Sequence, residues 1–302
     1  MTTFLSVSLA FFNVDSLTHA LAISAVCAVA GLPELIPFAV LGAVAPDIDV
    51  TFQRFSDRDP RLYILTHGGF THSFAGALIV ALSAALVALP VMALAGYGTP
   101  LLPAMAATLA GALSHLLLDF LAFPGIPLLY PVTDRKFTLG IAAGPTPYLL
   151  FASLVFGVFI VAGRASIAEP WVYGGFFTLV VLLSGALKLY VSARSGGRAI
   201  PGFDLVRWLI IAESADAYRV YGYHLLNGRQ PATEFPKLAG VSREEISLQM
   251  ARPEAKRMRY HSYIVTAARN GDGIELIDPL RLHGYLWYPP CYKRLLLPVV
   301  KR

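Results

Sequence analysis

The chain contains a long run without Asp, Glu, Lys or Arg, which extends from position 62 to position 118. Two further runs of this kind follow at residues 137–163 and 170–187. A helix needs about 20 apolar residues to cross the hydrocarbon core of a bilayer, so these runs predict membrane-spanning helices. The composition agrees, because hydrophobic residues make up 56% of the chain, charged residues make up 14%, and the mean hydropathy is +0.61. The sequence therefore predicts an integral membrane protein.

The density of charge changes near residue 197. The first 196 residues hold 8 Lys or Arg and 9 Asp or Glu, whereas the remaining 106 hold 16 and 10, a net charge of +6. We therefore expect a transmembrane helical domain at residues 1–196 and a basic soluble domain at residues 197–302. The predicted fold class is an all-α polytopic membrane domain of about six helices, some of them short, followed by a small cytoplasmic α+β domain that is rich in strands.

The apolar segments predict helices at about residues 16–30, 34–45, 71–95, 101–123, 146–162 and 171–193. The first two are short for a full span, and the third begins at Thr71, which is a suitable N-cap. In the C-terminal part, residues 206–213 and 217–226 are typical of strands. The Asn-Gly-Asp-Gly sequence at residues 270–273 predicts a hairpin turn. Residues 244–250 and 254–260 fit either helical turns or an edge strand.

Basic residues indicate the orientation in the membrane. If the six helices alternate, the loop at 51–70, the loop at 124–145 and the linker after residue 193 share one face. That face carries seven basic residues, and the other carries Arg164 alone. Because basic loops remain in the cytoplasm, we expect a multi-pass inner (cytoplasmic) membrane protein whose C-terminus is cytoplasmic. The seven basic residues are Arg54, Arg58, Arg61, Arg135, Lys136, Arg194 and Arg198.

Histidine and aspartate residues occur in four short motifs of the membrane part, and the predicted alternation puts all four at this same face. An aspartate at the centre of a bilayer costs about 2.5 to 3.5 kcal/mol, so ionisable residues near the membrane need a reason. In two motifs the pair is four residues apart, which places both side chains on one helix face. The motifs are "DSLTH" with Asp15 and His19, "PDID" with Asp47 and Asp49, "HGGFTHS" with His67 and His72, and "SHLLLD" with His115 and Asp119.

A shared metal ion is the interpretation that accounts for all four motifs together. Imidazole and carboxylate ligands suit Zn²⁺, Mn²⁺ or Fe²⁺, so we expect one or two divalent ions per chain, with zinc favoured. Each motif alone has a plainer interpretation: Asp15 and Thr71 as helix N-caps, His115 as an interhelical hydrogen bond, and Asp47 as part of a turn. The other histidines, which share no spacing, are expected to be ordinary ones: His224, His261 and His283.

The stretches "DSLTHAL", "LGAVAPDIDV", "HGGFTHS" and "GALSHLLLDFLAFPGIPLLYPVTDRKFTLG" resemble the membrane-bound metal-dependent hydrolase family, whose members are YdjM-like inner membrane proteins. The similarity covers about residues 13–145 and is loose beyond them. It implies a metal-dependent hydrolase whose metal ligands are Asp15, His19, Asp47, Asp49, His67, His72, His115 and Asp119. The family has His-Arg-Gly-x-Thr-His where this chain has Gly68 in place of the arginine. If that arginine holds a substrate phosphate, its role must pass to Arg135 or Lys136.

Two functions fit these motifs. In a hydrolase at the cytoplasmic interface, the metal would lower the pKa of bound water to about 7. Asp49 or Asp47 would act as general base, and Arg135 and Lys136 would bind a phosphoester or lipid-like substrate. In a metal-ion transporter or metal sensor, the same residues would carry or detect the ion. A transport pathway needs polar residues at several depths, whereas the sequence places these motifs in one layer.

Membrane lipids are the expected partners. The segment "RPEAKRMR" is basic, and residues near an anionic leaflet each gain about 1 kcal/mol, so this part of the C-terminal domain could bind an anionic lipid surface. Nucleic acid is the rival partner for this segment, although none is expected, and a plain solvated surface is the other interpretation. The basic residues of this segment are Arg252, Lys256, Arg257 and Arg259.

Overall fold

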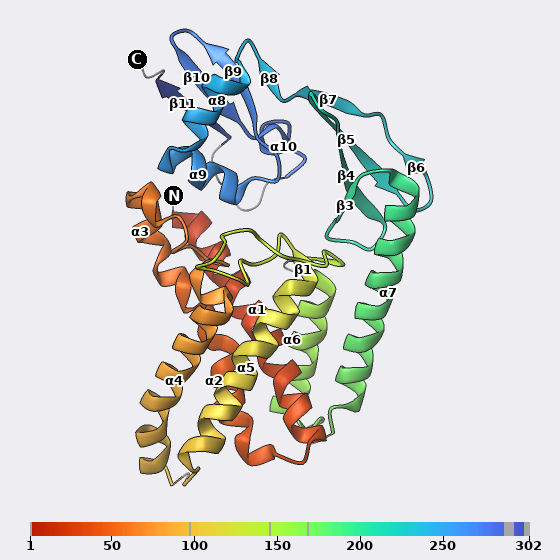
Figure 1. The fold of residues 1–302 in the computed structure, drawn as a ribbon. Coiled ribbons are helices and arrows are strands. Elements are labelled where there is room, and N and C mark those ends of the chain that lie inside the picture. Colours follow the sequence, from red (N-terminus) through yellow and green to blue (C-terminus); the bar gives the residue numbers. More distant parts are fainter. Residues whose placement is uncertain (1, 97, 145, 168, 287–292, 299–302) are drawn as a thin grey trace. The chain divides into compact units, whose positions relative to one another are not determined.

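Two separate units make up the chain in the computed structural model (Figure 1). The structure describes residues 2–96, 98–144, 146–167, 169–286 and 293–298, with side chains from residue 16 onward. The helical unit comprises residues 1–52, 66–188 and 203–205. The C-terminal unit comprises residues 53–65, 189–202 and 206–302.

Each of the six apolar segments is helical. Four stretches are long and apolar enough to cross a membrane, at Pro33–Arg58, Phe74–Leu94, Leu101–Leu121 and Trp171–Ser195. The apolar helices at Ser16–Val29 and Pro147–Val161 are shorter. Membrane-spanning helices are therefore supported by length and composition. The helices are α1 (Thr2–Val29), α2 (Ile36–Val44), α4 (Phe74–Leu94), α5 (Leu101–Leu121), α6 (Pro147–Val161) and α7 (Trp171–Ser195).

The predicted start of the third apolar helix was wrong by three residues. Helix α4 begins at Phe74, and its N-cap is Ser73, whose hydroxyl accepts a hydrogen bond of 3.0 Å from the Gly76 amide. Residues 70–72 form the separate 3₁₀ turn η4 (Phe70–His72). His72 therefore precedes the helix and does not lie in its first turn. Several residues of this segment are good N-caps, so the choice between them depends on tertiary contacts.

The backbones of α2 and α5 approach each other closely at two glycines. A Cβ atom built on Gly42 would lie 1.8 Å from the carbonyl oxygen of Thr108, and one built on Gly111 would lie 1.9 Å from the carbonyl oxygen of Ala39. Small residues allow this close approach of backbones, as they do in many membrane helix pairs. The contact fixes the position of the end of α5 relative to the segment that follows α2, which is the 3₁₀ turn η2 (Ala45–Thr51).

The loop after α5 folds back on itself. Strand β1 (Ala122–Phe123) pairs in parallel with β2 (Ala142–Ala143), and a bridge joins Ile126 to Phe137. The loop between the two strands carries the predicted substrate-binding residues Arg135 and Lys136.

The C-terminal unit is rich in strands, as predicted. One sheet has the order β3-β4-β5-β6, with β7 also paired to β5, and the other has the order β11-β10-β9-β8. The predicted hairpin is β9–β10, and its turn includes Gly271, which has a φ of +56°. The strands are β3 (Arg198–Pro201), β4 (Arg207–Glu213), β5 (Ala217–His224), β6 (Gly228–Arg229), β7 (Thr233–Pro236), β8 (Leu238–Ala239), β9 (Thr266–Asn270), β10 (Gly273–Ile277) and β11 (Arg294–Pro298). The helices are α8 (Arg243–Met250), α9 (Pro253–His261) and α10 (Pro279–Leu282).

The division into units differs from the boundary predicted at residue 196. Residues 189–202 belong to the C-terminal unit, and so do residues 53–65, which were expected to be a loop of the membrane domain. This segment contains α3 (Gln53–Arg58) and the 3₁₀ turn η3 (Pro60–Leu62), and it packs against α9. Charge density along the sequence does not reveal such a contact, because the partners are about 200 residues apart.

Candidate metal centre

Side chains from the four His/Asp motifs meet at one place in the helical unit. They come from α1, from η2, from the segment that ends in η4, and from the last two turns of α5. The side chain of Asp15 lies outside the described residues. The residues that meet are His19, Asp47, Asp49, His67, His72, His115 and Asp119.

Four atoms form the centre of this group, which we call the central cluster: Nε2 of His72, Nε2 of His115, Oδ1 of Asp47 and Oδ2 of Asp119. The two nitrogens are 3.1 Å apart. The Asp47 oxygen lies 3.7 Å from the His72 nitrogen and 3.6 Å from the His115 nitrogen. The Asp119 oxygen lies 3.2 Å from the first and 3.4 Å from the second. Both imidazoles are almost completely buried.

The spacing of these atoms fits a single small cation. A tetrahedral ion with bonds of about 2.0 Å to its ligands places neighbouring ligand atoms about 3.3 Å apart. The five separations that involve a histidine nitrogen lie between 3.1 and 3.7 Å, so each carboxylate oxygen is at this spacing from both imidazoles. Two imidazoles and two carboxylates are also a ligand set that zinc, manganese and iron accept. The residues present therefore fit a divalent metal ion.

The hydrogen bonds of the two histidines point their other nitrogens into the cluster. Nδ1 of His115 lies 2.7 Å from the Ala43 carbonyl oxygen, and Nδ1 of His72 lies 3.0 Å from Oδ2 of Asp49. Both oxygens are acceptors, so both Nδ1 atoms carry hydrogen and the Nε2 atoms of the neutral rings present lone pairs. Partners of this kind orient imidazoles that bind metals.

Four lone-pair donors that converge in a buried space repel one another unless a cation lies among them. In the absence of a metal, protons supply that positive charge. Burial lowers the pKa of His72, but the nearby carboxylates of Asp49, Asp119 and Asp47 outweigh burial and hold this pKa well above its usual value. A metal ion at the cluster would displace such protons.

Asp49 is fully engaged beside the central cluster. Its Oδ2 accepts hydrogen bonds from the Thr71 hydroxyl at 2.6 Å and the Gly68 amide at 3.2 Å, and it faces His72 Nδ1. Its Oδ1 lies 3.0 Å from Nδ1 of His67. The side chain is buried, and both of its carboxylate oxygens have partners. This geometry suits a residue that orients His72 better than it suits the general base predicted from the sequence.

Two further contacts extend the cluster toward α1. Oδ2 of Asp47 accepts a hydrogen bond of 2.5 Å from the Ser16 hydroxyl. Nε2 of His19 lies 3.5 Å from Oδ1 of Asp119, and its ring stacks on that of His115 with centroids 3.9 Å apart. Nδ1 of His19 is buried and has no hydrogen-bond partner among the described residues. Asp119 therefore connects the central cluster to His19.

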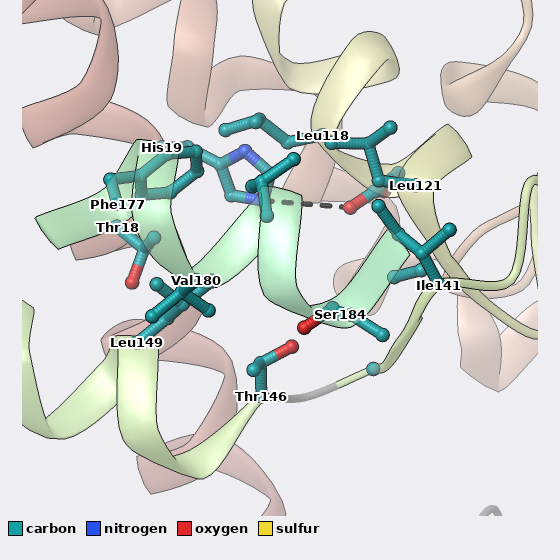
Figure 2. Close-up of a pocket in the computed structure, with 15 residues that line it drawn as sticks. Thr18, His19, Leu118, Leu121, Ile141, Thr146, Leu149, Phe177, Val180 and Ser184 are labelled. Atoms are coloured by element: carbon teal, nitrogen blue, oxygen red, sulfur yellow. Dashed lines mark ion pairs between the residues drawn. The ribbon is translucent and has the colours of Figure 1, made fainter. Parts of the chain in front are cut away.

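A pocket adjoins the cluster on the side of His19 and Asp119 (Figure 2). Figure 2 shows the ion pair of these two residues at one wall, while Thr146 and Ser184 lie at the opposite end. The hydroxyl of Ser184 is buried without a partner of hydrogen-bonding geometry among the described residues. Most of the remaining wall is apolar and comes from α5, α6, α7 and the segment that leads into β2, with Leu118, Leu121, Ile141, Leu149, Phe177 and Val180.

The two predicted substrate-binding residues lie away from this pocket. Arg135 is exposed, and its guanidinium lies over the Phe137 ring, 5.7 Å from the centroid. Neither Arg135 nor Lys136 is among the described residues that line the pocket. Their assignment to a substrate phosphate stays a prediction.

Sequence reasoning missed three groups that support the ligands: the Ser16 hydroxyl, the Thr71 hydroxyl and the Ala43 carbonyl. Ser16 directly follows Asp15 in the "DSLTH" motif, and Thr71 directly precedes His72, so nearness to a motif was the available signal. Thr71 was interpreted as a helix cap, and its hydroxyl instead donates to Asp49. A backbone carbonyl such as that of Ala43 gives no signal in a sequence.

Comparison with known proteins assigns the chain to a family. No curated protein and no solved structure matches it. The family model for the YdjM inner membrane protein matches residues 14–193, which is more than half of the chain and includes every residue of the central cluster. The family description agrees with the apolar helices described above. The chain therefore belongs to the YdjM inner membrane protein family.

Proposed function

We propose that this protein is a membrane-embedded hydrolase that depends on a divalent metal ion, with zinc favoured over manganese or iron. The observation that supports the proposal is that the Nε2 atoms of His72 and His115 lie 3.1 Å apart in a buried space, with an oxygen of Asp47 and one of Asp119 each 3.2 to 3.7 Å from both. His72, His115, Asp47 and Asp119 would hold the ion. When bound, such an ion supplies an activated water molecule at neutral pH.

The surrounding residues take distinct roles in this proposal. Asp49 fixes the ring of His72 through Nδ1, and the Ala43 carbonyl fixes the ring of His115. The imidazole of His67 contacts the other carboxylate oxygen of Asp49, with Nδ1 3.0 Å from Oδ1. We assign proton transfer to His19, because its ring lines the pocket and its Nε2 faces Asp119. The second carboxylate oxygen of Asp47 is held by Ser16, which leaves the first for the ion.

The pocket beside His19 supports a lipid-like substrate. Apolar residues such as Leu149 and Val180 form its side wall. The helices that carry them also expose apolar side chains on their outer surfaces. An ester or phosphoester that carries an apolar chain would place its polar group at His19 and Asp119 and its chain along this wall.

The test is hydrolysis by protein purified without chelators, assayed on a panel of phosphomonoesters, phosphodiesters and carboxylic esters with short and long apolar chains. We expect activity on at least one long-chain substrate, loss of that activity with a chelator and its return with Zn²⁺ or Mn²⁺. Val180→Trp, which fills the pocket, should abolish turnover of long-chain substrates and keep the bound metal. Leu182→Trp on the exposed side of α7 is the matched control. A panel with no metal-dependent turnover would contradict the hydrolase.

A metal-ion transporter remains the second candidate, and one observation favours it. The hydroxyls of Thr18, Ser153 and Tyr173 form a buried chain across α1, α6 and α7, with oxygens 2.9 Å apart at each step. Polar groups thus continue beyond the layer predicted from the sequence. Neutral hydroxyls are poor ligands for transition metals, so the chain supports transport less than the cluster supports hydrolysis. Uptake of zinc by proteoliposomes, abolished in Ser153→Ala, would favour the transporter.

We also propose that the metal centre and the C-terminal unit face the cytoplasm. Residues 53–65 carry three of the seven basic residues and fold with the C-terminal unit, so the two share one side of the membrane. The excess of basic residues makes that side cytoplasmic. A reporter fused after Arg302 should be active only in its cytoplasmic form, whereas one inserted at Arg164 should report the outside. The reverse result would contradict this topology.

A further inference from the structure

The two ligand-bearing segments of the centre are joined by a loop that belongs to the other unit. Asp47 and Asp49 lie in η2, and His67 and His72 lie before α4. Between them, residues 53–65 fold with the C-terminal unit, although the residues on both sides fold with the helical unit. The loop therefore begins and ends beside the metal centre, and its middle is held by another part of the chain.

Helix α9 makes the contacts that hold this loop. Nη2 of Arg257 lies 2.5 Å from Oδ1 of Asp57 in α3. The ring of Tyr260 packs edge-on against that of Tyr63, with centroids 5.3 Å apart, and the Lys256 ammonium lies 4.8 Å from the centroid of the same Tyr63 ring. Arg257 and Tyr63 are both buried. These contacts join an ion pair to an aromatic and cation–π cluster, and they involve successive turns of α9.

We propose that α9 is a positioning element of the metal centre, and that Arg257 acts through the loop 53–65 to hold the Asp47/Asp49 segment and the His67/His72 segment together. The proposal rests on the proposed binding of a metal by these segments. Arg257 is a positioning residue, and it acts through its ion pair with Asp57 in the loop.

The physical basis is the entropy of the loop. His67 Nδ1 lies 3.0 Å from Asp49 Oδ1, so residues 50–66 close a ring, and a free loop of this length opposes closure. When α9 fixes the middle of the loop, much of that entropy is already lost before the ion binds. The ligands are then held near their binding geometry, which raises affinity without any added contact to the metal.

This arrangement also changes the expected use of the basic segment at residues 252–259. Two of its four basic side chains, Lys256 and Arg257, contact the loop 53–65. Arg259 is exposed and remains available to an anionic lipid surface.

A charge swap tests the proposal in the full-length protein. The variants are Asp57→Arg, Arg257→Asp and the double variant that exchanges the two charges, with Arg259→Asp as the matched exposed control. The probe is Co²⁺, whose absorption spectrum reports ligand geometry, and its dissociation constant is measured by titration. We expect each single variant to weaken Co²⁺ binding by roughly tenfold, the low end of the range for residues that support metal ligands. The double variant should restore affinity and spectrum, and the control should leave both unchanged.

The outcomes separate this proposal from the proposed function. Single variants that bind Co²⁺ like the wild type, or a double variant no better than the singles, would overturn the positioning role. If the wild type binds no metal at all, the proposed function fails, and hydrogen exchange then tests the positioning by itself. In that case backbone amides of residues 66–73 should exchange faster in both single variants and return to the wild-type rate in the double variant. Unchanged exchange would overturn the proposal.

Discussion

His72→Ala and His115→Ala should each abolish metal binding almost completely, from about one ion per chain to nearly none. The two Nε2 atoms are 3.1 Å apart and belong to different segments, η4 and α5. Each imidazole supplies a quarter of the ligand atoms in the central cluster, and a buried site cannot replace the lost ligand with bulk water easily. Metal content of protein purified without chelators, measured by mass spectrometry, checks this expectation.

The double variant is the stronger test, because ligands of one ion act as a unit. Once either histidine is lost the ion is gone, so losing the second should cost little more in metal content or in thermal stability. Two unrelated interhelical hydrogen bonds would behave differently. His115 would lose its bond to Ala43 and His72 its bond to Asp49 independently, and the two losses of stability would add.

The control is His224→Ala, which changes a histidine of the C-terminal unit that takes no part in the cluster. It should leave the metal content unchanged. If the wild type carries no transition metal, or if the single variants retain it, the metal-dependent hydrolase is wrong. The four motifs would then be held together by protons shared between imidazoles and carboxylates.

The meeting of the four motifs could be predicted from the sequence for a topological reason. Each motif lies at an end of an apolar segment, and if successive segments cross the membrane in alternating directions, the ends that share a face follow from counting helices. His115 and Asp119 are also four residues apart on α5, which places both on one side of that helix. Depth and face therefore required no knowledge of the tertiary packing.

The roles within the cluster could not be predicted in the same way. Asp47 and Asp49 are two residues apart and equivalent in the sequence, yet one faces the central cluster and the other accepts hydrogen bonds from Thr71 and Gly68. The difference arises from the 3₁₀ turn η2, whose rotation per residue sends alternate side chains in different directions. Charge and spacing alone contain no information about that rotation.

The compact units differ from the predicted division for a related reason. Charge density assigned residues 53–65 to the membrane domain, because they lie between two apolar segments. Their partners are Arg257 and Tyr260, about 200 residues away, and nothing in the loop itself indicates them. The strand pattern of the C-terminal unit was predictable, because alternation and turn residues are local features.

The second prediction of a large effect concerns the contact between α2 and α5. Gly42→Ala should unfold or rearrange the helical unit, because the added methyl group would lie 1.8 Å from the Thr108 carbonyl oxygen, and a backbone atom cannot move aside as a side chain can. Overpacking of a core usually costs about 1 to 3 kcal/mol, and a clash between two helix backbones belongs at or above the upper end. We expect a large fall in the melting temperature of the detergent-purified protein.

The metal should be lost together with this contact. His115 is one turn beyond Gly111 on α5, and its Nδ1 bonds to the carbonyl of Ala43, the residue after Gly42. A separation of the two helices that accommodates a methyl group would break this bond, turn the imidazole and remove Nε2 from the central cluster. Gly42→Ala should therefore lower metal content, although position 42 supplies no ligand.

Gly185→Ala provides the matched control for this argument. Gly185 lies within α7, and an added Cβ would meet no atom within 4 Å. The same change there should be neutral or should stabilise the protein by up to about 1 kcal/mol, because alanine favours a helix more than glycine does. Equal melting temperatures and metal contents in Gly42→Ala and Gly185→Ala would show that the close approach of α2 and α5 does not position His115. A fall confined to Gly42→Ala would show that the geometry of the cluster depends on a glycine that bears no functional group.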